Sequence, residues 1–186
     1  MARIRTHQRC FTDDDLTLRP MTDDDLPLLA VWNADPEVLH FSEGDVDPYT
    51  PEETASTYEM LSKSADLYMI CVDGQAVGEC RLSSVRSPFP SPLDLSTDCR
   101  RIDVTIGEKS LWGKKYGSRA IGLLCRFAVE NTSCTHLFSG EIFDYNERAC
   151  KAFENNGFRV WKTYPSDGDD QPGQLIYFKP RLNKIF

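Results

Sequence analysis

A short segment rich in glycine, basic and hydroxyl residues has the chemistry to bind an anion. It runs Trp112-Gly113-Lys114-Lys115-Tyr116-Gly117-Ser118-Arg119-Ala120, between a predicted strand over 101–106 and a predicted helix from about 117. Free N–H groups and the dipole at a helix N-terminus favour a bound negative charge. The segment lacks the GxxxxGK[ST] and GxGxxG patterns of common nucleotide-binding loops. An ordinary loop with a solvated lysine pair is the alternative interpretation.

A second segment begins 34 positions after Trp112 and runs from Asn146 to Phe158. Asn146 is a helix-capping residue, and Gly157 suits the end of a helix over 146–155. Ala149 and Phe153 lie four residues apart, so they share one helix face. By itself this segment predicts only a capped amphipathic helix.

Together, the two segments resemble the GNAT superfamily of acetyl-CoA-dependent N-acetyltransferases. The first resembles the family's (Arg/Gln)-x-x-Gly-x-(Gly/Ala) pyrophosphate loop, and the second resembles its Asn-x-x-Ala-x-x-x-Tyr-x-x-x-Gly-Phe helix. The resemblance covers residues 16–178. It implies acetyl-CoA as co-substrate, with no metal. It places the donor-binding residues at Thr105, Ile106, Trp112, Gly113, Lys114, Lys115, Tyr116, Gly117, Ser118, Arg119, Asn146, Ala149 and Phe153.

Three residues depart from the family pattern. Trp112 replaces Arg or Gln, and it also occurs in relatives that act on antibiotics or on ribosomal-protein N-termini. Lys115 replaces the first glycine, where Gly would allow positive φ or close approach. Phe153 replaces a tyrosine that often serves as the acid. Either Tyr145 or Tyr116 supplies the proton instead, or the thiolate leaves unaided.

Two carboxylates are the predicted catalytic residues because a primary amine must lose a proton before it attacks a thioester. Asp103 ends the run Arg100-Arg101-Ile102-Asp103, eleven residues before Lys114, and Glu141 lies five residues before Asn146. Both positions resemble carboxylates of aminoglycoside 6′-N-acetyltransferases. The resemblance therefore implies 6′-N-acetylation of an aminoglycoside. The alternative is that these carboxylates pair with nearby arginines, since Arg81 is also available.

Two other functions stay open at this point. A protein N-terminal acetyltransferase of the ribosomal-protein type would use the same chemistry on a peptide in an open groove. A non-catalytic acyl-CoA-binding sensor would explain Lys115 and Phe153.

Composition limits the partners. The 186 residues include 21 Lys plus Arg and 29 Asp plus Glu, for a net charge of −8. This balance argues against a nucleic-acid partner and suits a small cationic amine. No apolar run approaches the ~20 residues of a membrane span, and residues 1–15 do not resemble a secretory signal. The seven cysteines form no CxxC and no zinc spacing, so we expect reduced thiols in a cytoplasmic protein. The sequence is compatible with both a monomer and a homodimer.

The predicted elements alternate in an α/β (α+β) pattern. Strands are expected over 16–19, 67–72, 76–82, 101–106, 136–143, 158–164 and 175–178, and helices over 22–36, 50–62, 117–130 and 146–155. This order predicts a mixed sheet covered by helices. The resemblance implies the GNAT fold, with a largely antiparallel central sheet, helices on both faces and splayed central strands. We expect one acetyltransferase domain over 16–186, a flexible extension over 1–15 and an exposed loop over 87–92.

Overall fold

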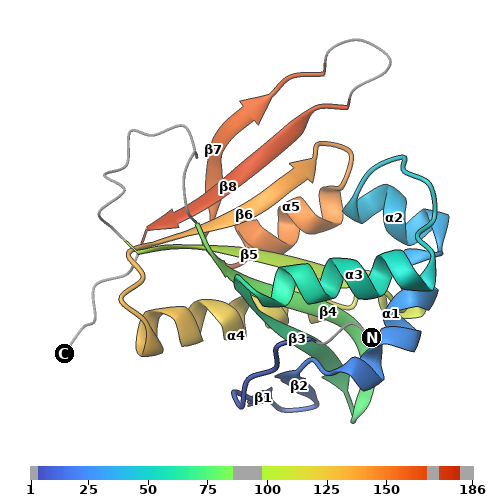
Figure 1. Cartoon of the computed structure of the whole chain (residues 1–186). Coiled ribbons are helices and arrows are strands. Elements are labelled where there is room, and N and C mark those ends of the chain that lie inside the picture. The colour runs from blue at the N-terminus through green and yellow to red at the C-terminus, as the bar shows by residue number, and fades with distance from the viewer. Residues whose placement is uncertain (1–3, 86–97, 167–171, 181–186) are drawn as a thin grey trace.

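The computed structural model describes residues 4–85, 98–166 and 172–180 (Figure 1). The loop predicted over 87–92 lies outside them. The elements follow in the order β1 (Phe11–Asp13), β2 (Leu16–Pro20), η1 (Asp23–Asp25), α1 (Leu26–Asn33), α2 (Pro36–Ser42), α3 (Pro51–Ser62), β3 (Ala65–Val72), β4 (Gln75–Ser84), β5 (Cys99–Ile106), η2 (Lys109–Leu111), α4 (Tyr116–Asn131), β6 (His136–Phe143), α5 (Glu147–Glu154), β7 (Arg159–Tyr164) and β8 (Gln174–Pro180).

One eight-stranded sheet organises the chain, in the order β1-β2-β3-β4-β5-β6-β8-β7. Every neighbouring pair is antiparallel except β5 and β6, which run parallel. Helices α1, α2 and α3 pack on one face, and α4 with α5 packs on the other (Figure 1). The predicted mixed, largely antiparallel sheet covered on both faces is confirmed.

Local signals explain several element boundaries. The α3 helix begins with a capping box, in which Thr50 Oγ1 accepts from Glu53 N at 3.2 Å and Thr50 N donates to Glu53 Oε2 at 2.8 Å. Pro36 was expected to end the first helix, but it begins a separate one. Asp35 caps this α2 helix by accepting from Glu37 N. Proline at the first helical position loses no hydrogen bond, which is why it starts a helix here.

The expected extension over 1–15 is wrong for residues 4–15, which pack on the domain. Phe11–Asp13 forms the edge strand β1 against β2, and Ile4 is buried beside α1 and α3. Phe11 also packs on Phe127 of α4, with ring centroids 4.8 Å apart. These residues gain apolar burial and a strand partner, and neither is visible in a local sequence pattern.

Candidate active site

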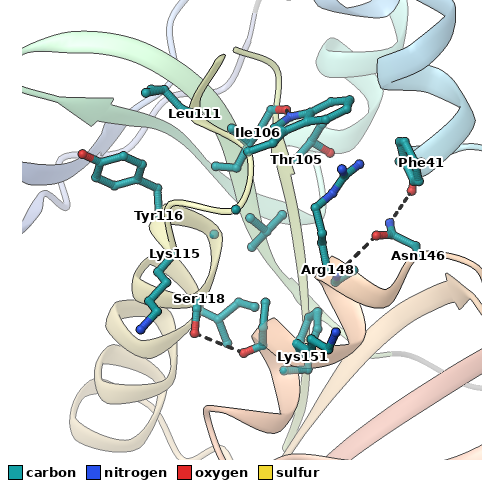
Figure 2. A pocket seen from close by; sticks show the side chains of 18 of the residues that line it. Phe41, Thr105, Ile106, Leu111, Lys115, Tyr116, Ser118, Asn146, Arg148 and Lys151 are labelled. Carbon is teal, nitrogen blue, oxygen red and sulfur yellow. Dashed lines mark hydrogen bonds between the residues drawn. The ribbon is translucent and has the colours of Figure 1, made fainter. Parts of the chain in front are cut away.

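A cavity of about 330 Å³ lies where β5 and β6 separate (Figure 2). The two strands pair in register only from Cys99 with His136 to Ile102 with Ser139. Beyond Ile102, the edge of β5 that faces β6 is open, so the expected splayed strands are present. The walls come from the end of β5, the loop after it, the start of α4, α5 and part of α2.

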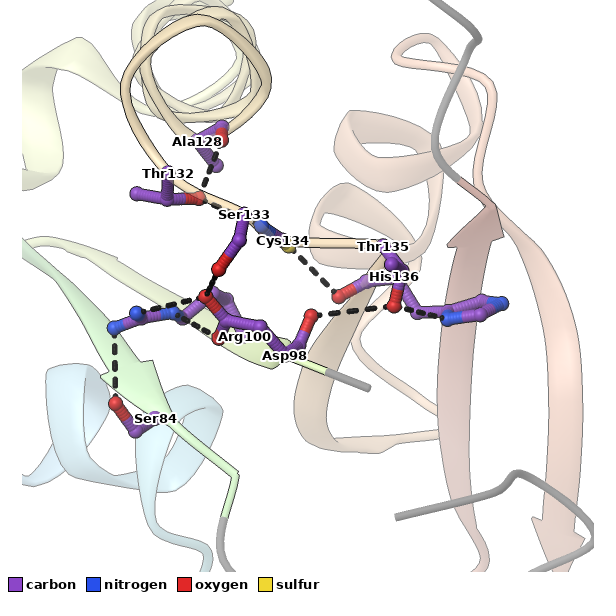
Figure 3. Close-up of polar contacts among 9 residues, drawn as sticks. All are labelled: Ser84, Asp98, Arg100, Ala128, Thr132, Ser133, Cys134, Thr135 and His136. Atoms are coloured by element: carbon purple, nitrogen blue, oxygen red, sulfur yellow. Dashed lines mark hydrogen bonds and ion pairs between the residues drawn. The ribbon is translucent and has the colours of Figure 1, made fainter. Parts of the chain in front are cut away.

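The opposite end of this strand pair is held closed by a polar network (Figure 3). The Asp98 carboxylate accepts from Arg100 Nε at 2.7 Å and from Ser133 Oγ at 2.8 Å. Thr135 N donates to the Asp98 carbonyl at 2.7 Å, and Arg100 Nη1 donates to Ser84 Oγ at 2.9 Å. These contacts tie the starts of β5 and β6 together, so the strands diverge only toward the cavity.

The charged side chains of the cavity wall are all basic. Among the described residues, Lys115, Arg148 and Lys151 line it, and no carboxylate does. In a chain of net charge −8, such a lining favours an anionic ligand. Of the residues predicted to bind the donor, those in the cavity wall are Thr105, Ile106, Trp112, Gly113, Lys115, Tyr116, Gly117, Ser118, Asn146, Ala149 and Phe153.

The loop reaches the start of α4 through two left-handed residues. Gly113 has φ of 77° and Lys115, the N-cap of α4, has φ of 68°. Lys115 therefore adopts the backbone conformation for which a glycine is suited. Arg119 N makes the first helical bond, to the Lys115 carbonyl at 3.0 Å. The amide groups before it lie at the cavity wall, where a helix N-terminus can hold an anion.

Substituting Lys115 separates the role of its backbone from that of its ammonium. Lys115→Gly is expected to have a free energy of unfolding about 1 kcal/mol higher than that of Lys115→Ala, because alanine keeps the strain of the left-handed region. Both variants lose the same ammonium, so both should weaken acetyl-CoA binding about two- to fivefold. Chemical denaturation measures the difference in stability, and calorimetric titration measures acetyl-CoA binding. Equal stability of the two variants would show that residue 115 does not need positive φ.

Two residues of the predicted donor site, Arg119 and Lys114, are not in the cavity wall. Arg119 Nη1 donates to Asp15 Oδ1 at 2.7 Å, and its Nε donates to Asp13 Oδ2 at 3.3 Å. The prediction that Arg119 binds the donor is therefore corrected. Its guanidinium binds the turn between β1 and β2, which lies in the segment predicted from the sequence to be a flexible extension.

Trp112 and Asn146 hold the cavity wall in place. Trp112 Nε1 donates to the Ile106 carbonyl at 2.7 Å, which fastens the loop to β5 but occupies one of the groups expected to pair with pantetheine. Asn146 Oδ1 accepts from Ala149 N at 3.1 Å, and its Nδ2 donates to the Phe41 carbonyl at 2.8 Å. Asn146 is thus the predicted helix cap, and it also joins α5 to α2.

Neither candidate tyrosine directs its hydroxyl to the cavity. Tyr145 Oη donates to the His40 carbonyl at 2.6 Å, and burial raises the pKa of this tyrosine. Tyr116 Oη donates to Asp15 Oδ2 at 3.2 Å. Phe153 is buried and packs on the ring of Phe158. Of the expected alternatives, unaided departure of the thiolate is the one that this geometry favours.

The two predicted carboxylates have arginine partners and do not line the cavity. Asp103 accepts from Arg81 Nε at 3.0 Å and from Arg101 Nη2 at 2.7 Å. Glu141 is exposed, 3.5 Å from Arg101 Nη1. Both oxygens of Asp103 therefore accept hydrogen bonds from arginines, so its carboxylate is better placed to position these arginines than to accept a proton.

Glu79 is the carboxylate that the sequence analysis missed. It is 6% exposed, and its Oε2 has no hydrogen-bond partner among the described residues. Burial raises its pKa to about 7, as suits a general base near neutral pH. Glu79 lies opposite Thr105 in the β4–β5 register, and Thr105 lines the cavity. The one local signal was an acidic residue inside the apolar run of β4.

Other charges gather around Glu79. Arg81 and Asp103 face each other across the same two strands, and Glu43 interacts electrostatically with both. With Arg101 and Glu141, this acidic cluster contains four carboxyl groups and two guanidinium groups. It is net negative even when Glu79 is protonated. A basic cavity therefore adjoins an acidic cluster, with Thr105 between them.

Comparison with known proteins identifies the family. The family model described as "Acetyltransferase (GNAT) domain" matches residues 15–159. The chain belongs to the GNAT acetyltransferase family. At the level of this domain, the match confirms the predicted enzyme class, an acetyl-CoA-dependent N-acetyltransferase.

Solved structures agree with the GNAT assignment. The aminoglycoside acetyltransferase AAC(6')-Ib in complex with ribostamycin and coenzyme A is similar, with 20% identity, a TM-score of 0.76 and coverage of 90% of this chain and 94% of that chain. A GNAT-family acetyltransferase from Bacillus anthracis has 12% identity, a TM-score of 0.69 and coverage of 96% and 98%. At these identities the likeness shows the fold. It confirms the predicted GNAT fold.

A curated relative extends the comparison to a longer protein. An uncharacterized protein of Methanocaldococcus jannaschii is 27% identical over 150 residues. The match spans 81% of this GNAT chain but only 29% of the relative.

No helix in the described ranges has the length and apolarity to cross a bilayer. In the same ranges, no group of three or more His, Cys, Asp or Glu residues could hold a metal ion.

Proposed function

We propose that this GNAT domain transfers the acetyl group of acetyl-CoA to a primary amine of a small cationic molecule, most specifically an aminoglycoside at its 6′ amine. The observation that carries this proposal is the pairing of a basic cavity with an acidic cluster around Glu79. The cavity suits the anionic donor, and the cluster suits a cationic acceptor.

Each part of the site has a role in this reaction. The amide groups at the start of α4 hold the pyrophosphate, and the open edge of β5 pairs with the pantetheine arm. Glu79, directly or through a water, takes the proton from the amine. The amine nitrogen then forms a bond to the thioester carbonyl carbon. The C–S bond breaks and releases the thiolate of coenzyme A.

Asp103 and Glu141 take a binding role in this scheme, in place of the predicted catalytic one. Asp103 holds Arg81 and Arg101 beside Glu79. Glu141 and Glu43 are the exposed carboxylates of the cluster, so they are open to a cationic acceptor. AAC(6')-Ib, in its complex with ribostamycin, supports an aminoglycoside as the acceptor. We propose the cytoplasm as the compartment, since none of the seven cysteines, all of which lie in the described ranges, forms a disulfide.

The test is thiol release from acetyl-CoA with a panel of acceptors. Kanamycin, tobramycin, spermidine and a short peptide with a free N-terminus are compared at equal concentration. We expect release with the aminoglycosides to be at least 100-fold faster than background. Release with the peptide alone would favour an N-terminal acetyltransferase. Acetyl-CoA binding without release for any acceptor would favour a sensor.

A further inference from the structure

Arg148 lies against two aromatic rings in the cavity wall. Its guanidinium carbon lies 4.2 Å from the ring centroid of Phe41 and 4.3 Å from that of Trp112. The two rings pack edge to face, with centroids 5.5 Å apart. Figure 2 shows Arg148 reaching from the first turn of α5 toward Thr105 and Ile106 of β5.

Both rings are anchored by hydrogen bonds of their own residues. Trp112 Nε1 donates to the Ile106 carbonyl at the end of β5. The Phe41 carbonyl accepts from the Asn146 amide, which caps α5. The rings therefore come from two separate elements, α2 and the loop after β5, and both restrain the position of the guanidinium through cation–π contact. This position is at the open end of the strand pair, away from Ile102, where β5 and β6 last pair.

The N–H edge of this guanidinium is unused. Within the described part of the chain, Arg148 makes no ion pair or hydrogen bond. Arg81, Arg100, Arg101 and Arg119, by contrast, all pair with carboxylates. Lys151, another cation of the cavity wall, pairs with Glu147 at 3.0 Å. A planar guanidinium with a free N–H edge matches two oxygens of a phosphate.

We propose that Arg148 is a specificity-determining residue for the donor, pairing through its N–H edge with a phosphate group of coenzyme A. Phe41 and Trp112 already restrain its guanidinium, so the pairing orders little further side-chain freedom. The inference rests on the cavity being the donor site of the proposed function. Coenzyme A offers two phosphate sources, the pyrophosphate and the 3′-phosphate on its ribose, and the test separates them.

The experiment compares Arg148→Gln and Arg148→Lys with the wild-type protein on three donors. These are acetyl-CoA, acetyl-dephospho-CoA, which lacks the 3′-phosphate, and acetyl-pantetheine, which has neither phosphate group. For Arg148→Gln we expect KM for acetyl-CoA to rise about 10- to 100-fold, with kcat within twofold. Arg148→Lys keeps the charge but not the planar fork, so it should recover only part of this loss. KM for acetyl-pantetheine should not change.

Acetyl-dephospho-CoA identifies which phosphate group of the donor pairs with Arg148. A loss that persists with acetyl-dephospho-CoA assigns the pyrophosphate, and a loss that disappears assigns the 3′-phosphate. Arg126→Gln is the matched control, since Arg126 is an exposed arginine of α4 outside the cavity. An unchanged KM for acetyl-CoA would overturn the proposal. So would an equal rise for acetyl-pantetheine, because Arg148 would then act through packing alone.

Failure of the proposed function would look different. A wild-type protein that binds coenzyme A but transfers no acetyl group would contradict the proposed reaction only. Calorimetric titration of coenzyme A into the wild-type protein and Arg148→Gln would then still test the pairing, with the same 10- to 100-fold difference expected in Kd.

Discussion

Replacing Glu79 with glutamine is expected to lower kcat/KM for acetyl transfer by about 100- to 10,000-fold, the range for a lost general base. Glutamine keeps the shape of the side chain but cannot take the proton of the amine. Steady-state thiol release measures the loss. Acetyl-CoA affinity should stay within twofold, because Glu79 does not line the donor cavity. Glu130→Gln, at an exposed position of α4, is the control.

The same residue sets the expected pH profile. Because the base must be ionised, kcat/KM of the wild-type enzyme should rise with pH and level off above its pKa of about 7. In Glu79→Gln this step should disappear. An activity within threefold of wild type, or an unchanged step near pH 7 in the variant, would exclude Glu79 as the base.

Glu79 should also make folding stability depend on pH. Its folded pKa of about 7 lies above the ordinary value of 4.5, so the folded protein retains this proton over that range and the unfolded chain does not. The contribution of Glu79 to stability therefore falls as pH rises from about 4.5 to 7, by about 3 kcal/mol as an upper estimate. Comparing denaturation of the wild-type protein and Glu79→Gln at pH 5 and pH 8 measures the difference.

Placing a methyl group at Gly78 is expected to damage both stability and donor binding. A Cβ there would lie 2.3 Å from the Thr105 carbonyl oxygen and 3.0 Å from Ile106 Cα. Both neighbours are backbone atoms of β5, so the strand itself must move. We expect Gly78→Ala to lose about 1–3 kcal/mol of unfolding free energy. Acetyl-CoA binding should weaken about tenfold, since Thr105 and Ile106 line the cavity.

Gly74→Ala is the control for this effect. Gly74 has φ of 80° in the β3–β4 turn, and a Cβ there would meet nothing within 4 Å. This variant should lose stability through backbone strain but keep its affinity for acetyl-CoA. Thermal denaturation measures the stability of the two variants. Calorimetric titration of the folded variants measures their affinity for acetyl-CoA. If both lose affinity equally, the displacement of β5 is not what weakens binding.

Local sequence patterns were sufficient for most elements and for most residues of the basic cavity. The Thr50–Glu53 capping box and the Asp73-Gly74 turn depend on neighbouring residues, so they are visible without the fold. The same holds for the loop at Trp112 and the Asn146 helix, because each residue acts through its own backbone or its own helix face. Their family pattern therefore located the cavity wall, apart from Lys114 and Arg119.

The acceptor half and the N-terminal segment depended on contacts between distant residues. Arg119 pairs with Asp13 and Asp15, about a hundred positions away, and β1 exists only because β2 lies beside it. No periodic pattern reports such pairings.

The sequence by itself determined the family and predicted the donor and the loop proposed to bind it, because these depend on short-range backbone geometry. Only the tertiary structure decided which carboxylate is buried with a raised pKa, as the proposed base requires. Asp103 and Glu79 are both acidic residues on adjacent strands, but two arginines pair with Asp103, while Glu79 is buried and its Oε2 has no hydrogen-bond partner in the described ranges. Burial and partners set the pKa of a carboxylate, and both are properties of the packed sheet.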